Sequence, residues 1–230
     1  MTAWPDSAGL DLLALWAEPG RAHAAWLDPA TLAITRASLP AVAGRFPALS
    51  PRHPAAAWFE RAIADLWGLE AEGAADLRPW LDHGLWPVRA PLSGAAARHS
   101  PAQELPEFLP VQGAGIHQVP VGPIHAGIIE PGHFRFHVQG ETVVRLEARL
   151  GYTHKGTLAL MQGKSPRAAM RFAARLSGDA TVAHSLAFAR AAEAAAGGPP
   201  PPRAEATRRA MLELERLHNH LNDLGFIAND

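Results

Sequence analysis

The sequence HFRFHVQGETVVRLEARL, residues 133–150, predicts the element around which the fold is organised. Apolar and polar side chains alternate along residues 134–138 and again along residues 144–150. A period of two residues is typical of a β-strand that buries one face. Gly140 lies between the two runs and can adopt the positive φ that a tight turn requires. We therefore expect an antiparallel β-hairpin here.

Three helices are predicted after the hairpin. Ser165 and Pro166 provide an N-cap and a first helical residue for a helix that runs to about Leu176. A second helix should occupy residues 180–196 and end at the following glycine pair. The third has an apolar stripe at alternating four- and three-residue spacing and ends at Gly225, where an αL cap is expected. The stripe consists of Ala210, Leu214, Leu217, Leu221 and Leu224.

The N-terminal half predicts a small α/β domain. Short apolar runs at residues 12–18, 22–28 and 32–39 are separated by Pro- and Gly-containing turns, which indicates a strand meander. Residues 54–70 then show apolar side chains three or four positions apart, as expected for a helix.

A Pro- and Gly-rich stretch separates the two halves. We interpret residues 93–120 as a linker between a domain at residues 1–92 and a domain at residues 121–230. The fold class is therefore α+β. Because Asp230 follows the predicted cap with no closing element, we expect the chain to stop before its fold is complete.

Composition excludes several classes of function. The chain has 230 residues, is 48% hydrophobic and has a formal net charge of −1, so bulk charge predicts no nucleic-acid partner. No apolar run approaches the roughly 20 residues that span a bilayer. Asp6 lies where a signal peptide would be basic, so we expect no export signal. The absence of cysteine excludes disulfides and is compatible with the cytoplasm.

Four motifs follow one another in the second half: VGPIHAGIIEPGHFRFHVQGE, LGYTHKG, RLSGDATVAHSLAFA and PPRAEATRRAMLELERLHNHLNDLG. Together they resemble the large subunits of membrane-bound energy-converting nickel-iron hydrogenases and the homologous quinone-site large subunit of respiratory complex I. Their order and spacing make the resemblance specific. It implies that the hairpin and helices form part of the hydrogenase large-subunit fold.

The first half resembles the smaller peripheral-arm subunit that precedes the large subunit in several such hydrogenases. WFERAIADLWGLEAEG and DLRPWLDHGLWP carry this resemblance. The first fifty residues match less closely. The matching positions are Trp58, Glu60, Asp65, Gly68, Asp76, Arg78 and Trp86.

The nickel ligands of the hydrogenases are missing. The resemblance places Ser177 and Ala180 where these enzymes have two cysteines, and the whole sequence contains no cysteine. Nickel-iron centres and iron-sulfur clusters need soft thiolate ligands. We therefore predict that this chain holds no metal and no cluster of its own, and that an iron-sulfur cluster lies on a partner subunit.

The quinone site of complex I is also altered. The family places a histidine four residues after the His125 position, but Ile129 stands there, and its tyrosine position aligns with Gly178. A quinone remains the cofactor class that the resemblance implies, with His133 and Asp179 as candidate contacts.

Glu130 matches the glutamate that relays protons beside the metal in the hydrogenases. Such a relay requires a glutamate with a raised pKa. The alternative is a surface glutamate before a Pro-Gly turn, whose pKa would not be raised. His125 flanks the same loop. His133 and His137 share one strand face. They could form a metal site together with Glu130, or they could be structural histidines held by hydrogen bonds.

His184 matches the histidine that follows the lost cysteines. We expect it to work with Glu130 and His125 as a proton relay or as pocket lining. Ser177 and Asp179 either line this pocket or cap the next helix, and capping is the preferred interpretation. Lys155 is expected to be structural or part of an interface.

The resemblance implies a subunit of a hydrogenase-like or NADH:quinone oxidoreductase-like complex that couples electron transfer to proton or ion movement. The alternative is a non-catalytic scaffold or assembly subunit of such a complex. The implied partners are an iron-sulfur small subunit, a ferredoxin-like subunit and membrane antiporter-like subunits. The expected location is peripheral, on the cytoplasmic side of the inner membrane.

Overall fold

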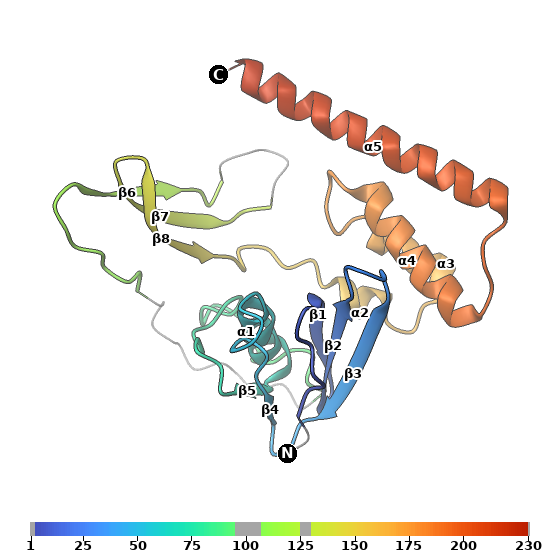
Figure 1. The fold of residues 1–230 in the computed structure, drawn as a ribbon, viewed down its shortest axis with the longest axis horizontal. Coiled ribbons are helices and arrows are strands. Elements are labelled where there is room, and N and C mark those ends of the chain that lie inside the picture. Colours follow the sequence, from blue (N-terminus) through green and yellow to red (C-terminus); the bar gives the residue numbers. More distant parts are fainter. Residues whose placement is uncertain (1–2, 95–106, 125–129, 230) are drawn as a thin grey trace. The chain divides into compact units, whose positions relative to one another are not determined.

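The computed structural model describes residues 3–94, 107–124 and 130–229. The chain forms two compact units, residues 1–121 with 132–152 and residues 122–131 with 153–230 (Figure 1). Strands occur in the first unit and helices dominate the second, so the predicted α+β class is confirmed.

The N-terminal strand meander is confirmed. Strands β1 (Asp11–Glu18), β2 (Arg21–Leu27) and β3 (Ile34–Pro40) form an antiparallel sheet in chain order. Gly20 has a φ of 72° in the turn between β1 and β2, a conformation that favours glycine. The Asp28 carboxylate accepts hydrogen bonds from Ala30 N and Thr31 Oγ1 and so stabilises the next turn.

Helix α1 (Ala56–Trp67) covers one face of this sheet. It ends at Gly68, whose φ is 67° and whose N–H donates to the Ala64 carbonyl, as in an αL cap. Strand β4 (Arg45–Pro47) precedes the helix in the chain and β5 (Glu70–Glu72) follows it. The two strands pair in parallel. The predicted helix at residues 54–70 is thus confirmed, with shorter ends.

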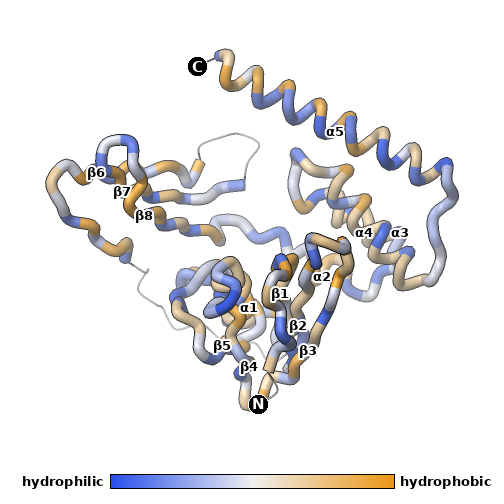
Figure 2. Tube along the Cα trace, in the orientation of Figure 1, coloured by the Kyte–Doolittle hydropathy of each residue, from blue (hydrophilic) through white to orange (hydrophobic). Residues whose placement is uncertain are grey.

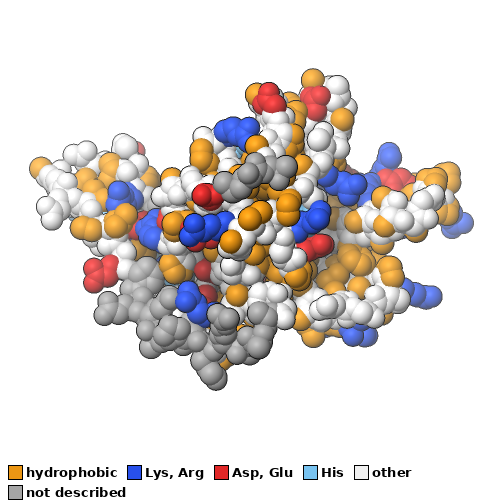
Figure 3. Space-filling view, turned by 90° about the horizontal axis from the view of Figure 1, so that it is seen from below, with side chains coloured by type: hydrophobic (Ala, Val, Ile, Leu, Met, Phe, Trp, Pro, Cys, Tyr) orange, Lys and Arg blue, Asp and Glu red, His pale blue; other side chains and the backbone are white. Residues whose placement is uncertain are grey.

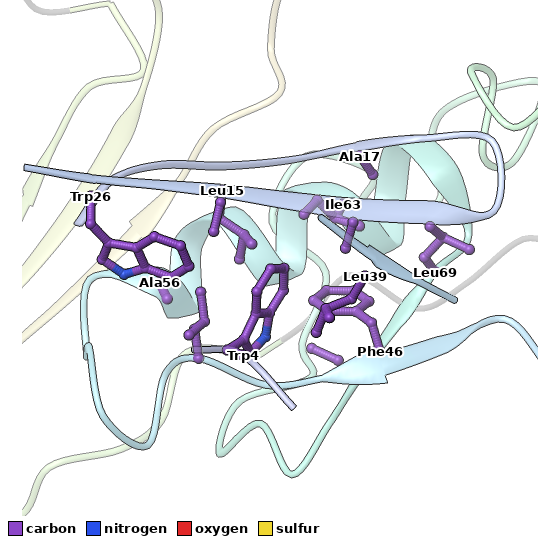
Figure 4. Packing of buried hydrophobic residues seen from close by; sticks show 13 residues of the cluster. Trp4, Leu15, Ala17, Trp26, Leu39, Phe46, Ala56, Ile63 and Leu69 are labelled. Carbon is purple, nitrogen blue, oxygen red and sulfur yellow. The ribbon is translucent and has the colours of Figure 1, made fainter. Parts of the chain in front are cut away.

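The core of this part lies between sheet and helix (Figure 4). Trp26 and Phe46 are fully buried, and Trp4 meets Trp26 edge to face with ring centroids 6.0 Å apart. Trp4 Nε1 also donates to the Pro47 carbonyl at 2.6 Å, which satisfies its polar atom. Burial of each large side chain contributes about 1.5–3 kcal/mol, so residues up to Ala74 have a hydrophobic core of their own.

The predicted hairpin is also confirmed. Strands β7 (His133–Gln139) and β8 (Thr142–Arg149) pair antiparallel around Gly140, which has a φ of 58°. A third strand, β6 (Ile116–Val121), pairs with β7 and forms the other edge of the sheet. All of it except Val121 lies inside the range that we interpret as a linker, and its Pro120 is tolerated because β6 is an edge strand.

The second unit contains α2 (Thr157–Met161), α3 (Pro166–Ala173), α4 (Thr181–Ala196) and α5 (Pro202–Asn229). Two predicted helix boundaries are confirmed. Ser165 accepts a hydrogen bond from the Ala168 amide at the start of α3, and Gly197 ends α4 with a φ of 80°.

The predicted cap at Gly225 is wrong. Helix α5 continues to Asn229, and Gly225 does not adopt a positive φ. Apolar residues follow Gly225, and one glycine within a long helix costs only about 1 kcal/mol. The helix is amphipathic along its length (Figure 2). Its polar side faces α4 through Glu193–Arg208 and Arg190–Glu205 ion pairs.

The apolar stripe of α5 is exposed in the described structure, with Leu214 at 65% and Leu221 at 60% exposure. Hydrophobic side chains are also interspersed with charged ones on the face that Figure 3 shows. Among the described helices, none combines the length and apolar character that a bilayer-spanning helix requires.

Candidate functional site

Lys155 joins two loops of the second unit. Its ammonium group forms an ion pair with the Glu130 carboxylate and donates to the carbonyls of Arg175 and Leu176 at 3.2 and 3.1 Å. Thr153 Oγ1 donates to the other Glu130 oxygen at 3.2 Å. The Glu130 turn is therefore connected to the backbone just before Ser177. The sequence alone indicates a structural or interface role for Lys155. It does not predict that Lys155 connects these two loops.

The Glu130 carboxylate is held in its charged form. Its pKa is lowered, first because Lys155 donates a hydrogen bond to it and also because Thr153 does. Desolvation acts in the opposite direction but does not outweigh the Lys155 hydrogen bond. The pKa is therefore not raised as a proton relay would require, because the hydrogen bond from Lys155 has a larger effect than burial.

Ser177 and Asp179 form a small hydrogen-bonded loop. The Ser177 hydroxyl donates to the Asp179 carboxylate, and Asn219 Nδ2 donates to the Asp179 carbonyl at 2.9 Å. The pKa of Asp179 is lowered, first by the Ser177 hydrogen bond, with a smaller contribution from the charge of His184. His184 lies in the first turn of α4, so Asp179 and His184 are brought near each other.

The N-terminus of α4 is not capped by Ser177 or Asp179, so the preferred interpretation of that loop is wrong. Its N-cap residue is Ala180, which has no side-chain acceptor. Instead, Glu215 of α5 accepts hydrogen bonds from Val182 N at 2.5 Å and Ala183 N at 2.9 Å. Sequence reasoning missed Glu215. An alanine at the start of a helix was the available signal that the free amides need an acceptor from elsewhere.

His133 and His137 lie on the same face of β7, as predicted from their spacing. Both are buried, and the His133 ring lies 5.2 Å from the ring of Phe108. His125 falls outside the described residues. In the part of the chain that the structure describes, no three His, Asp or Glu side chains come together as a metal site. The alternative of a metal held by Glu130, His133 and His137 is therefore not supported.

The ligand chemistry at the lost cysteine positions does not fit nickel. The Ser177 hydroxyl is engaged with Asp179, and Ala180 offers no donor atom. This sequence contains no thiol that could replace them. We therefore derive no reaction step through a nickel centre on this chain.

The motif residues of the first half hold its loops in place. Asp65 Oδ2 accepts hydrogen bonds from the amides of Trp80, Leu81 and Asp82. Asp76 pairs with both Arg61 and Arg78. Hydrogen bonds from Arg78 are the largest cause that lowers the pKa of Asp76, to about 2. These contacts give Asp65, Asp76 and Arg78 a structural role in this part of the chain.

Comparison with known proteins relates the two halves of the chain to two different families. Residues 26–97 match the family described as the 30 kDa subunit of respiratory-chain NADH dehydrogenase. Residues 155–223 match the nickel-dependent hydrogenases. The resemblances stated for the two halves are thereby confirmed.

Several characterised proteins are similar to the chain. Hydrogenase-4 component G of Escherichia coli K12 is 36% identical over 84% of this chain and 36% of its own length. Formate hydrogenlyase subunit 5 of the same organism is 34% identical over 80% of this chain and 34% of its own length. The C/D subunit of NADH-quinone oxidoreductase from Azotobacter vinelandii is 30% identical over 81% of this chain and 35% of its own length.

The alpha subunit of the membrane-bound hydrogenase from Pyrococcus furiosus is 36% identical, but over only 49% of this chain and 26% of its own length. The chain spans about a third of the length of the relatives that match both of its halves.

Proposed function

Because the chain joins a segment related to the complex I 30 kDa subunit to a segment related to the nickel-dependent hydrogenases, we propose that it is a subunit of a hydrogenase-like or NADH:quinone oxidoreductase-like complex. Its role there is electron transfer coupled to proton or ion movement, without a nickel-iron centre of its own. The match across both halves, in the same order as in the C/D subunit, is the observation that carries this proposal.

Within such a complex, the proton-handling group is Glu130. The pKa of its carboxyl is lowered, first because Lys155 donates a hydrogen bond to it. Protonation of this carboxylate would break its ion pair with Lys155, so we propose that proton uptake is coupled to movement of the loop that precedes Ser177. His125 and His184 are the proposed further members of the relay. His133 and Asp179 are the proposed contacts of a quinone-type cofactor.

Electrons must come from partner subunits because this sequence lacks thiols. We propose an iron-sulfur small subunit, a ferredoxin-like subunit and antiporter-like membrane subunits as partners. The proposed location is peripheral, on the cytoplasmic side of the inner membrane.

The test is purification of the affinity-tagged chain from membranes of its own host after mild detergent treatment. We expect iron-sulfur and antiporter-like subunits to co-purify in fixed stoichiometry and the complex to reduce a quinone analogue. Stoichiometric nickel bound by the chain together with hydrogen uptake would contradict the prediction that a chain without thiol ligands holds no nickel. Recovery of the chain without redox subunits would contradict the proposal that it is a subunit of a redox complex.

The lowered pKa of Glu130 and the loss of both ligand positions favour a second candidate, a non-catalytic scaffold or assembly subunit. The Glu130→Gln variant separates the two functions. A relay predicts an assembled complex with greatly reduced turnover, whereas a scaffold predicts unchanged assembly and unchanged turnover. The Glu213→Gln variant, altered at an exposed position of α5, is the matched control.

A further inference from the structure

The hydrogen bonds and ion pairs that α5 forms with α4 come from one side of α5. The residues of α5 that contact α4, or the loop before it, are Glu205, Arg208, Glu215 and Asn219. An α-helix turns by about 100° per residue, so these positions lie within about 80° of one another around the helix axis. This polar side of α5 is therefore occupied within the second unit.

The apolar stripe of α5 lies on the opposite side. Its residues are centred about 180° around the helix axis from the contacts with α4. Every leucine of the stripe is more than half exposed, and Figure 2 shows apolar positions along the length of the helix. Because the contacts with α4 leave this side free, a second polypeptide can reach the whole stripe without displacing α4.

The apolar stripe is narrow. The residues that flank its middle part are polar, namely Glu213, His218 and His220. A helix that packs on a globular core has a further apolar position beside such a stripe, whereas apolar residues at only the first and fourth positions of a heptad form the seam of a coiled coil. The width of the stripe therefore favours one partner helix over a broad apolar core.

The stripe also repeats every seven residues. Spacings of four and three alternate from Ala210 to Leu224, and Thr207 and Ala228 continue this spacing at the two ends. A repeat of about three heptads is long enough to indicate a coiled coil. Because a straight helix has 3.6 residues per turn, the stripe stays in contact with a partner only if two helices with the same repeat wind around each other. A second copy of α5 provides that repeat.

From the width, repeat and free position of the stripe, we propose that α5 pairs in parallel with α5 of a second copy of this chain as a two-stranded coiled coil. The charges beside the stripe set the orientation. In a parallel pair Glu213 of one copy lies beside His218 of the other, five residues further along. An antiparallel pair would place His218 beside His218 and His220 beside His220, with no acid between them.

The affinity of this pair comes from the leucines. An exposed pair such as Glu213 with His218 contributes little, so it selects the orientation without adding much to the association. Apolar contacts are not screened by salt, unlike ion pairs. The pair should therefore persist when salt is raised from about 0.1 to 1 M. The proposal concerns a surface of α5 that the proposed electron-transfer role does not use, so either can fail without the other.

Sedimentation equilibrium of the purified full chain measures the association. Between about 1 and 100 μM the apparent mass should rise from that of one chain toward that of two, with the same transition at low and high salt. A single-chain mass throughout this range would overturn the proposal and would leave the stripe to a different polypeptide. Dissociation caused by high salt alone would overturn the apolar seam.

A charge placed in the stripe tests which residues form the contact. Leu217→Glu should raise the dissociation constant about a hundredfold or more, because it buries two carboxylates side by side in an apolar seam. Glutamate and leucine have similar helix propensities, so α5 should still form. Phe226→Glu is the matched control: Phe226 is equally exposed but lies outside the stripe, and its replacement should not change the association. Equal effects of the two variants would refute the stripe as the interface.

Single cysteines test the orientation, since the sequence has no cysteine of its own. In a parallel pair Ala210 lies beside Ala210 of the second copy, so Ala210→Cys should form an intermolecular disulfide in a glutathione redox buffer. In an antiparallel pair Ala210 would lie near Ala228 instead. Arg209→Cys, one residue away and outside the stripe, is the control and should not cross-link. A dimer in which Ala210→Cys does not cross-link, or cross-links no better than Arg209→Cys, would overturn the parallel arrangement.

Discussion

Glu130 and Lys155 form an ion pair that connects the Glu130 turn with the backbone carbonyls just before Ser177. Two loops that are distant in the sequence are therefore linked through one ammonium group. This arrangement lowers the pKa of Glu130, so protonation of its carboxylate has to disturb the contact with Lys155.

Replacement of Lys155 by Met should raise the pKa of Glu130 toward its ordinary value of 4.5, because the largest cause of its lowering is removed. A carboxylate with a depressed pKa contributes stability that is present above pH 4.5. This stability is lost as the pH falls through the pKa of the folded state. Nuclear magnetic resonance titration of the Glu130 carboxyl carbon measures the shift. Lys164→Met, which removes an ammonium group near Phe172, should leave the titration unchanged.

Replacement of Glu215 by Ala should lower the free energy of unfolding by about 1–2 kcal/mol, the usual cost of losing an N-terminal helix cap. The amides of Val182 and Ala183 lose their acceptor, and α4 loses a contact with α5. Urea titration followed by circular dichroism measures the change. Glu213→Ala removes only an exposed ion pair with Arg216 and should change the free energy by less than about 0.5 kcal/mol. Equal losses in both variants would show that Glu215 does not cap α4.

Replacement of Glu60 by Ala should cost about 2–3 kcal/mol of unfolding free energy. Glu60 is 2% exposed, and its Oε1 accepts from the amides of Leu49 and Ser50. Glu60→Gln keeps an acceptor for these amides and should cost clearly less. Chemical denaturation compares the two variants, and a Gln variant as unstable as the Ala variant would mean that the charge itself is required.

The Asp76 network should make the first unit sensitive to acid. Arg78 and Arg61 lower the pKa of Asp76 from 3.8 to about 2. Its stabilising contribution is therefore fully present above pH 3.8 and is lost as pH falls toward 2. Urea unfolding between pH 5 and pH 2 should show this loss in the unaltered chain and a smaller one in Asp76→Asn. Parallel pH profiles for the two proteins would contradict it.

Local patterns predicted most of the secondary structure correctly. The alternation around Gly140 and the Ser165-Pro166 helix start depend on neighbouring residues only, and both are confirmed. Strand β6 was missed because its pairing with β7 is not local and its surroundings have the composition of a linker. The cap at Gly225 was wrong because a glycine can end a helix but need not do so.

The candidate site depended more on tertiary contacts. Glu130, Asp179 and His184 were found from motif positions alone, but Lys155 and Glu215 act on groups at least 20 residues away along the chain. No sequence pattern states which distant carbonyl or amide a long side chain will reach. The sign of the Glu130 pKa shift depends on the same kind of contact, so the sequence left it open between the relay and the surface glutamate.

The sequence by itself determined the relationship to two subunit families, the hairpin, the helix starts and the absence of thiol ligands, since each of these depends on residue identity and short spacing. Only the tertiary structure decided that Lys155 forms an ion pair with Glu130, that Glu215 caps α4 and that Glu147 accepts a hydrogen bond from Arg78. Electrostatic and hydrogen-bond energies depend on distances of about 3 Å between side chains, and those distances exist only after the chain has folded.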